Sequence, residues 1–367
     1  MRCQRQGGCG GEGADKAGES RVEQKSGVSQ VKSFINVSGT IRVMNRVIVV
    51  GGAGFIGSAV CRNLLSKGLQ PVVMDMLAQY MPQLVPDEAR VVALRKRFEG
   101  IDGQVIFTRG NASNYGEIHK MLAEHKPSAV IHLGGISITS TSNEYIEEAI
   151  ESSLQATISI IRAIAAVDSS IRFVYTSSST IYGDFQYAPA DEKHPSNPKG
   201  VYAGIKLAGE NITRAFCTQL GIPFVIVRPQ AVYGPTDTNR RVLQKFVEAA
   251  MKGEELQVND PTNAIDFTYL DDVAEGFVLA ATKENAVNET FNLSSGNART
   301  LQELVDILKK YFPDLKVNVR EANQNLPRRG SMSIKKAKEL LSYEPKYTLE
   351  KGVEEYVKHL KENKLFS

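Results

Sequence analysis

Residues 47–57 read VIVVGGAGFIG, and this stretch decides the fold. Four β-branched residues in a row predict a buried strand, and the residues after the glycines have the apolar spacing of a helix. In such a unit one glycine permits a tight turn, another lets the backbone approach a pyrophosphate, and a third allows close helix–strand packing. The helix N-terminus then offers free N–H groups to phosphates. We therefore predict a dinucleotide site that includes Gly51, Gly54, Phe55, Ile56 and Gly57.

An acidic residue follows at the spacing that such a site needs. Asp75 ends the next apolar run, 71–75, about 20 residues after Gly54, where a carboxylate binds the ribose hydroxyls of the cofactor. Its negative charge would repel the additional phosphate of NADP. The sequence therefore predicts NAD as the cofactor.

The rest of the chain extends this unit into a doubly wound fold. Short apolar runs alternate with amphipathic stretches, which predicts a Rossmann-type parallel sheet covered on both faces. The predicted strands are 46–50, 71–75, 104–108, 129–133, 172–176 and 224–227. Beyond about residue 228 the pattern becomes irregular, with helical stretches at 242–253, 301–312 and 349–362. We expect a Rossmann domain over 44–227 and a smaller α/β substrate-binding region over 228–367, of which about 266–285 returns to the Rossmann domain.

Composition narrows the class of protein. Residues 1–43 are rich in glycine and charge, and we expect this extension to be disordered. The remaining residues carry equal numbers of basic and acidic side chains, which argues against nucleic acid as a partner. Four cysteines without metal-ligand spacing predict no metal site and suit a reducing cytoplasm. No apolar run looks long enough to cross a membrane.

Two stretches, YAGIK at 202–206 and YTLEK at 347–351, each place a tyrosine four residues before a lysine. Tyr202 follows the hydroxyl-rich stretch SSSTIYG, which comes directly after the fifth predicted strand, at the sheet edge where the cofactor is expected. We expect the Lys206 ammonium to lower the pKa of Tyr202 and make it a general base. Tyr347 has no such neighbour, and Lys351 is interpreted as a solvated helix residue.

Residues 44–363 resemble an extended short-chain dehydrogenase/reductase of the NAD-dependent nucleotide-sugar epimerase/dehydratase branch. The resemblance rests on the order and spacing of GGAGFIG, AVIHLGG, SSSTIYG, YAGIKLAGE, VIVRPQAVYGP and DFTYLDDVAEG. It implies tightly bound NAD, a nucleotide sugar as substrate, and a catalytic trio of Ser178, Tyr202 and Lys206. The further cofactor contacts that it implies are Asn111, Ala112, Leu133, Gly134 and Pro229.

The resemblance also favours one reaction. Related 4,6-dehydratases carry an Asp–Glu acid pair after the catalytic hydroxyl, and related decarboxylases usually keep a Glu there. Ser179 and Thr180 take those places here, as in the UDP-glucose 4-epimerase type. The implied reaction is an epimerisation in which Tyr202 takes the C4 hydroxyl proton while the C4 hydride moves to NAD and back.

The substrate contacts depart from the family pattern. Ala231 replaces a common Asn, and Ile265 replaces a common Arg that binds diphosphate. We therefore predict that other residues contact the substrate. The arginines at 240 and 241 could bind its phosphates, or they could be solvated helix residues without a role in binding. The predicted contacts are Ser178, Thr180, Arg240, Arg241, Arg328 and Arg329. The sequence is also compatible with a different nucleotide sugar, or with a hydroxy substrate that carries no nucleotide.

Two alternatives to an epimerase also stay open. One is a reductase or dehydrogenase of the same fold that releases NAD(H) in every cycle. The other is a catalytically silent NAD-binding protein or an RNA-binding relative, although the Ser, Tyr and Lys that silent members tend to lose are present. The apolar helical stretch 149–166 resembles the family's dimer-forming helix, so we expect a homodimer.

Overall fold

The structure, a computed structural model, describes residues 34–35, 41–42, 45–77, 87–239, 241–320 and 327–363. The chain divides into two units, Met1–Val43 and Met44–Ser367. In the first unit, β1 (Phe34–Ile35) and β2 (Ile41–Arg42) pair antiparallel. The disorder predicted for residues 1–43 stays a prediction, because the other residues of this segment lie outside the described ranges.

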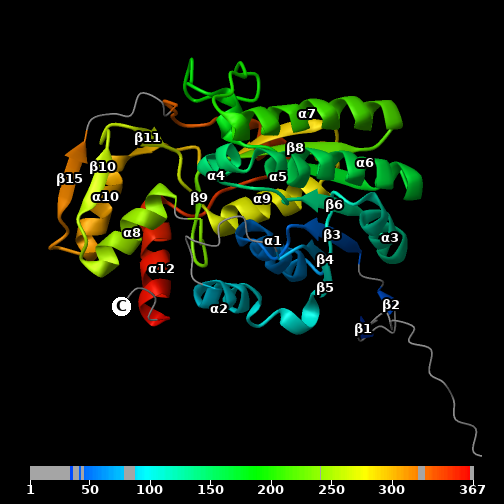
Figure 1. Cartoon of the computed structure of the whole chain (residues 1–367), viewed down its shortest axis with the longest axis horizontal. Helices are drawn as coiled ribbons and strands as arrows, with labels where there is room; N and C mark the ends of the chain where they lie inside the picture. The colour runs from blue at the N-terminus through cyan, green and yellow to red at the C-terminus, as the bar shows by residue number, and fades with distance from the viewer. Residues whose placement is uncertain are drawn as a thin grey trace, which may run out of the picture. The chain divides into compact units, whose positions relative to one another are not determined.

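Seven parallel strands form the main sheet of the second unit, in the order β13-β8-β7-β6-β3-β4-β5 (Figure 1). They are β3 (Arg46–Val50), β4 (Gln70–Asp75), β5 (Ile106–Arg109), β6 (Ala129–His132), β7 (Arg172–Thr176), β8 (Phe224–Pro229) and β13 (Glu289–Leu293). The first six match the predicted strands to within two residues at each end, which confirms the Rossmann-type fold. The seventh, β13, was missed because its sequence was assigned to the irregular C-terminal region.

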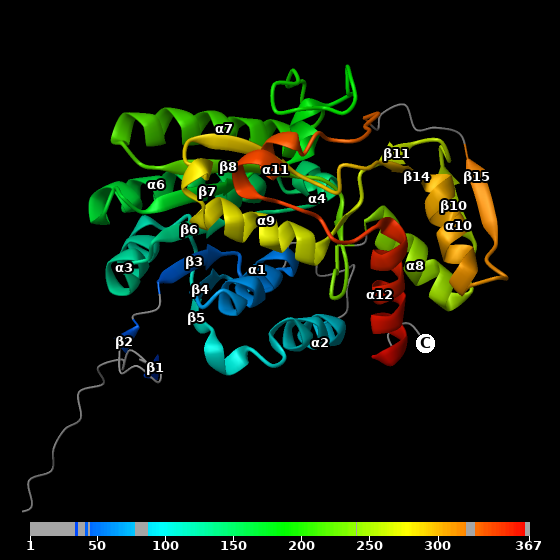
Figure 2. The same cartoon turned by 180° about the vertical axis from the view of Figure 1, so that it is seen from behind.

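Alternating residues of β3 show how the sheet is covered. Val47 and Val49 pack into one apolar cluster with α1 (Phe55–Ser66) and α9 (Leu270–Thr282). Ile48 and Val50 point to the other face, toward α3 (Tyr115–His125), α6 (Ala156–Val167) and α7 (Val201–Leu220). Figures 1 and 2 show these two helical layers on either side of the strands. Both faces of the sheet are therefore buried, as continuous apolar strands require.

Other helices and turns connect these layers. They are α2 (Asp87–Phe98), η1 (Asp102–Gln104), α4 (Thr139–Glu144), α5 (Ile146–Ala149), the π-helix η2 (Ile150–Gln155), η3 (Ser179–Tyr182), η4 (Glu284–Ala286) and α11 (Lys335–Leu341). One helix among the described residues, Ile146–Val167, is long and apolar enough to cross a membrane by length and composition alone, a test that a buried core helix also passes. Its α6 portion packs between α3 and α7 over the sheet, as a core helix does. The homodimer expected through this helix stays a prediction.

The C-terminal region forms a smaller body beside the sheet (Figure 1). Three helices, α8 (Val242–Lys252), α10 (Leu301–Tyr311) and α12 (Leu349–Glu362), pack their apolar faces together and confirm the helical stretches predicted there. Three strand pairs complete it: β9 (Val232–Tyr233) with β12 (Thr268–Tyr269), β10 (Leu256–Asn259) with β15 (Val317–Arg320), and β11 (Ala264–Ile265) with β14 (Arg299–Thr300).

Candidate active site

A cavity of about 1640 Å³ extends from the glycine-rich turn after β3 to the C-terminal region. Residues predicted from nine separate stretches of sequence meet on its wall. The predicted residues that line it are Gly51, Gly54, Phe55, Ile56, Gly57, Asp75, Asn111, Ala112, Leu133, Gly134, Ser178, Thr180, Tyr202, Lys206, Pro229, Arg241 and Arg329.

The turn that opens the cavity needs its glycines. Gly51 has a φ of +75°, and a Cβ there would lie 2.7 Å from the backbone nitrogen of Gly134. A Cβ on Gly57 would collide with the carbonyl of Gly51. Gly54 caps α1 without a side chain, so the first N–H groups of the helix open toward the cavity. This geometry suits the pyrophosphate of a dinucleotide.

Asp75 is held at the end of β4 beside this turn. One carboxylate oxygen accepts from the backbone N–H of Ala53 at 3.0 Å, and the other accepts from that of Leu77 at 2.8 Å. Burial raises the pKa of Asp75, while these two hydrogen bonds and the Arg97 guanidinium oppose the rise. The carboxylate is therefore fixed where the ribose hydroxyls of a dinucleotide would lie.

Arg97 of α2 ties this turn to a distant loop, and sequence reasoning missed it. Its guanidinium donates to the carbonyl of Ala53 at 3.1 Å and to that of Thr236 at 2.8 Å. The buried Asp237, in the same loop, faces both Arg97 and Arg241. No local pattern in the sequence links residues so far apart in the chain.

Asn111 and Ala112 line the cavity beyond β5. The Asn111 side-chain oxygen Oδ1 accepts from the backbone N–H of Ser113 at 2.9 Å, and the side-chain nitrogen Nδ2 donates to Glu151 at 3.3 Å. Glu151 belongs to the π-helix η2, which sequence reasoning did not predict. π-helical turns often occur at functional sites, and this one brings a carboxylate against Asn111, which lines the cavity.

Ser178 and Tyr202 meet at the carboxyl edge of the sheet. Ser178 caps η3, directly after β7, and accepts from the backbone N–H of Thr180 at 3.2 Å. Tyr202 is the second residue of α7, and Ser178 is among the groups that oppose the rise in the pKa of its phenol. Lys206 lies one turn later and donates to the carbonyl of Thr176 at 3.0 Å. The trio that the resemblance implied is thus assembled in one place.

The expected effect of Lys206 on Tyr202 was wrong. Burial raises the pKa of Tyr202, and the groups that oppose the rise are Arg241 first, then Ser178 and Arg329. The Lys206 ammonium is bonded to Thr176 and lies 5.8 Å from the centre of the Tyr202 ring. Burial also lowers the pKa of Lys206 to about 8, which weakens its charge near that pH. Two arginines, rather than the lysine, therefore favour the phenolate.

A set of unpartnered hydroxyls surrounds Ser178. Four buried side-chain oxygens of the stretch 176–180 make no hydrogen bond within the described part of the chain, and all four residues line the cavity. They belong to Thr176, Ser177, Ser179 and Thr180. Buried polar groups are normally paired, so these hydroxyls indicate a site for a polyhydroxyl or anionic ligand.

The four predicted arginines differ in their placement. Arg241 and Arg329 line the cavity together with Tyr202. Arg328 is exposed outside the cavity wall, and its backbone N–H donates to Asp184 at 2.8 Å. Arg240 lies outside the described residues.

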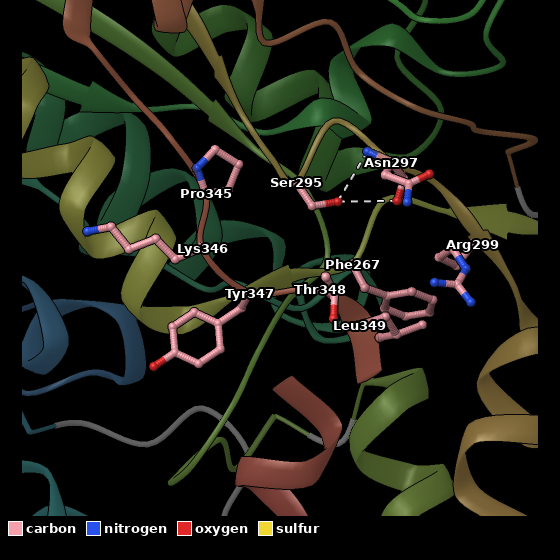
Figure 3. Close-up of a pocket in the computed structure, with 9 residues that line it drawn as sticks. All are labelled: Phe267, Ser295, Asn297, Arg299, Pro345, Lys346, Tyr347, Thr348 and Leu349. Carbon is pink, nitrogen blue, oxygen red and sulfur yellow. Dashed lines mark hydrogen bonds between the residues drawn. The ribbon is translucent and has the colours of Figure 1, made fainter. Parts of the chain in front are cut away.

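Tyr347 lies in a different place. It borders a separate cavity of about 230 Å³ together with Phe267, Ser295 and Arg299 (Figure 3). Its ring stacks on that of Tyr269 at 4.0 Å, and the Lys351 ammonium lies 4.2 Å from its centre. Packing therefore accounts for this tyrosine–lysine pair.

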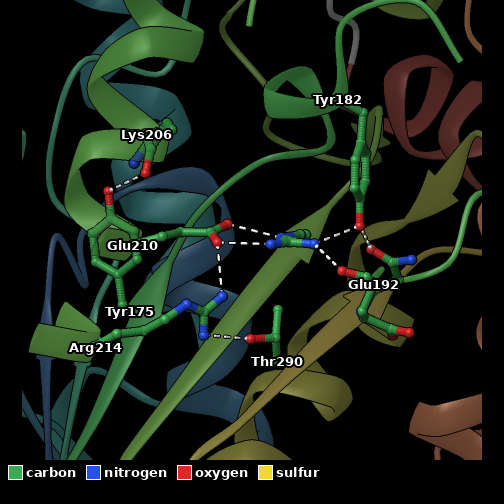
Figure 4. Close-up of polar contacts among 9 residues, drawn as sticks. Tyr175, Tyr182, Glu192, Lys206, Glu210, Arg214 and Thr290 are labelled. Carbon is green, nitrogen blue, oxygen red and sulfur yellow. Dashed lines mark hydrogen bonds and ion pairs between the residues drawn. The ribbon is translucent and has the colours of Figure 1, made fainter. Parts of the chain in front are cut away.

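A buried polar network joins the elements that carry the trio (Figure 4). Arg228 of β8 donates to both carboxylate oxygens of Glu210, which lies on α7 one turn after Lys206. The same guanidinium donates to the hydroxyl of Tyr182, at the end of η3. Tyr182 in turn donates to Asn292 of β13 at 2.7 Å. Sequence reasoning missed this network because its members come from four separate elements.

Within the described residues no cluster of three or more His, Cys, Asp or Glu side chains is arranged to hold a metal ion. The two cysteines of that part, Cys61 and Cys217, are buried and free, and burial raises the pKa of each thiol to about 12. Neither residue lines the cavity.

Comparison with known proteins matches residues 47–294 to the model of the NAD dependent epimerase/dehydratase family. A putative UDP-glucose 4-epimerase of Methanocaldococcus jannaschii is 26% identical over 86% of this chain and 99% of its own. A dTDP-glucose 4,6-dehydratase of Xanthomonas campestris is 25% identical over 83% of this chain and 90% of its own. Both reactions therefore occur among relatives at similar distance.

A solved structure agrees with the sequence matches. UDP-glucose 4-epimerase of Thermus thermophilus, in complex with NAD, superposes with a TM-score of 0.72 over 86% of this chain and 99% of its own, at 25% identity. The seven-stranded sheet and its helical layers thus match the fold of this NAD-bound relative.

Proposed function

Because the chain belongs to the NAD-dependent epimerase/dehydratase family, we propose that it is a nucleotide-sugar 4-epimerase with NAD as its resident cofactor. The glycine turn, Asp75 and the rim at Asn111 fit the dinucleotide. We infer that residues 44–227 hold NAD and that the region from 228 onward mainly holds the substrate.

One observation supports epimerisation over loss of water. Among the described residues that line the cavity, the acidic ones are Asp75 and Asp237. Asp75 is bonded to the glycine turn, and Asp237 faces Arg97 and Arg241. Around Tyr202 the stretch 176–180 supplies hydroxyls instead of a carboxylic acid. Elimination of water needs a group that protonates the leaving hydroxyl, and an aliphatic hydroxyl is a poor acid for that task.

The residues of this chain have defined roles in the proposed reaction. Tyr202, as phenolate, takes the proton from the C4 hydroxyl of the sugar and returns it in the second half of the cycle. Ser178 hydrogen-bonds the same sugar oxygen and keeps it beside Tyr202. Lys206 is anchored to the carbonyl of Thr176 and would hold the cofactor ribose. NAD, when bound, supplies the acceptor for the C4 hydride and gives the hydride back.

Mass analysis of the denatured protein for co-purified NAD, followed by assays on UDP-, GDP- and dTDP-sugars, tests this function. The proposal expects NAD in the protein and interconversion of C4 epimers without net NADH. Net NADH formation would identify the dehydrogenase alternative. Bound NAD with no turnover of any sugar would favour a silent NAD-binding protein.

A further inference from the structure

The backbone of Ala53, in the glycine-rich turn, is held by side chains on both sides. Its N–H donates to the Asp75 carboxylate at 3.0 Å, and its carbonyl accepts from Nη1 of Arg97 at 3.1 Å. The turn leads directly into α1, whose first N–H groups have no partner within the helix. Asp75 and Arg97 together therefore fix the conformation in which these N–H groups are presented to a pyrophosphate.

The same guanidinium also contacts the C-terminal region. Nη2 of Arg97 donates to the carbonyl of Thr236 at 2.8 Å and to the hydroxyl of Thr238 at 3.4 Å. Both threonines belong to the loop between β9 and α8, which extends toward α2 in Figures 1 and 2. Ala53, Arg97 and Thr238 line the large cavity. The guanidinium thus joins the cofactor turn to the C-terminal region at the cavity wall.

The loop is strained at the residue that Arg97 holds. Thr236 has a φ of +66°, a left-handed conformation that a β-branched residue rarely adopts. Strained backbone persists only where the surrounding contacts hold it in place. The bond from Arg97 to the carbonyl of this same residue is such a contact. Loss of the bond should therefore release the loop over residues 234–239.

Arg97 is anchored through its own backbone on the side of the cofactor turn. Arg62 of α1 donates at 2.7 to 3.1 Å to three carbonyls at the end of α2, those of Lys96, Arg97 and Glu99. Because α1 begins at the glycine-rich turn, the turn, α1 and the end of α2 form one connected unit. The loop over 234–239 is then the partner that moves when the bond to Arg97 breaks.

These contacts assign a role to a residue that lies outside the catalytic trio. On the basis of the proposed function, we propose that Arg97 is a positioning residue that couples retention of NAD to the loop over residues 234–239. While Arg97 binds both carbonyls, the cavity wall stays closed between the pyrophosphate turn and this loop, and NAD cannot leave there. A ligand that orders the loop from the substrate side slows NAD release further, because coupling between two sites acts in both directions.

The rate of NAD release tests this proposal. The NAD-loaded protein is mixed with excess isotopically labelled NAD, and exchange of the bound cofactor is followed by mass spectrometry of the denatured protein. Arg97→Gln should speed exchange about 10- to 100-fold, the effect of losing hydrogen bonds from a charged donor. UDP, GDP and dTDP are then added as probes. The one that binds should slow exchange at least about fivefold in the unmodified protein and less than about twofold in Arg97→Gln.

Two further variants separate the bridge from charge and from folding. Arg97→Lys keeps the positive charge, but a single ammonium cannot span both carbonyls, so its exchange rate should lie within about threefold of that of Arg97→Gln. This variant also carries the test if Arg97→Gln does not fold. Arg95→Gln, at an exposed position of the same helix outside the cavity wall, should leave exchange unchanged. The melting temperature is measured for every variant.

Three outcomes would overturn the proposal. Slow exchange in Arg97→Lys would assign Arg97 to a charge contact with the cofactor phosphates. An equal effect of the bound nucleoside diphosphate on the unmodified protein and on Arg97→Gln would remove the coupling to the loop. Unchanged exchange in Arg97→Gln would reject the bridge altogether. Each of these results leaves the epimerase function intact, and that function fails separately if the NAD-loaded protein converts no nucleotide sugar.

Discussion

The Arg228 guanidinium donates to the two carboxylate oxygens of Glu210, at 2.8 and 2.7 Å, in the buried core between β8 and α7 (Figure 4). Burial alone would lower the pKa of Arg228, but the hydrogen bonds and charge of Glu210 raise it. The same guanidinium donates to Tyr182 at 2.8 Å. The helix that carries Tyr202 and the turn that begins at Ser178 are thus fixed to one group.

Arg228→Gln should therefore affect both stability and activity. It leaves the Glu210 carboxylate buried without its main partner, which should lower the free energy of unfolding by about 3–5 kcal/mol. Below the unfolding transition, kcat should fall more than KM rises, because the geometry between Ser178 and Tyr202 loosens. Chemical denaturation and steady-state kinetics provide the measurements.

Arg214→Gln is the matched control for that variant. Arg214 also donates to Glu210, at 3.0 Å, but its side chain is 39% exposed. Its loss should cost about 1 kcal/mol or less. Equal destabilisation by the two variants would show that the buried pair has no special role.

Tyr202→Phe should reduce turnover by at least about 100-fold, because the phenyl ring cannot accept a proton. It should keep NAD bound, since the glycine turn and Asp75 are unchanged. Tyr347→Phe, in the smaller cavity, should change neither property. Activity assays and mass analysis of bound NAD check both variants; full activity in Tyr202→Phe would remove this tyrosine from the reaction.

The pH dependence of the rate should respond to Arg241. Tyr202 acts in its deprotonated form, so the rate should increase with pH until its pKa is passed. Because Arg241 lowers the pKa of Tyr202, Arg241→Gln raises that pKa and should move the acid limb of the kcat profile to higher pH. Arg328→Gln should leave the limb in place. A shift toward lower pH would contradict the electrostatic role given to Arg241.

Gly57→Ala should abolish retention of NAD. The new Cβ would collide with the Gly51 carbonyl and lie 2.6 Å from the Gly52 Cα, so the turn that receives the pyrophosphate has to open. Gly103→Ala is the matched control, because nothing lies within 4 Å of an added Cβ there. The ratio of NAD to protein after purification distinguishes the two, and normal NAD content in Gly57→Ala would argue against this turn as the cofactor site.

Sequence alone predicted what depends on local spacing. The glycine turn, Asp75 and the Tyr202–Lys206 pair lie within or directly after single elements, so their places at the sheet edge follow from the strand–helix pattern. Strand β13 was missed because it enters the sheet from a region whose apolar pattern is irregular.

Contacts between distant segments explain the other differences between the predictions from sequence and the structure. Neither the hydrogen bonds of Arg228 nor those of Arg97 can be seen in any short stretch of sequence. The electrostatic role assigned to Lys206 failed for the same reason. Helical spacing placed the Lys206 ammonium near the phenol of Tyr202. In the folded chain this ammonium donates to the carbonyl of Thr176, and the charges of Arg241 and Arg329 are the ones that lower the pKa of Tyr202.

Inversion at C4 with retained NAD is the central step of the proposed function. The most direct measurement incubates the purified protein, without added cofactor, with a UDP-sugar and follows the products by NMR and mass spectrometry. We predict that either C4 epimer yields the same mixture of both, with unchanged mass and no accumulation of NADH. A product that lacks the mass of one water, or stoichiometric formation of NADH, would contradict the epimerase assignment.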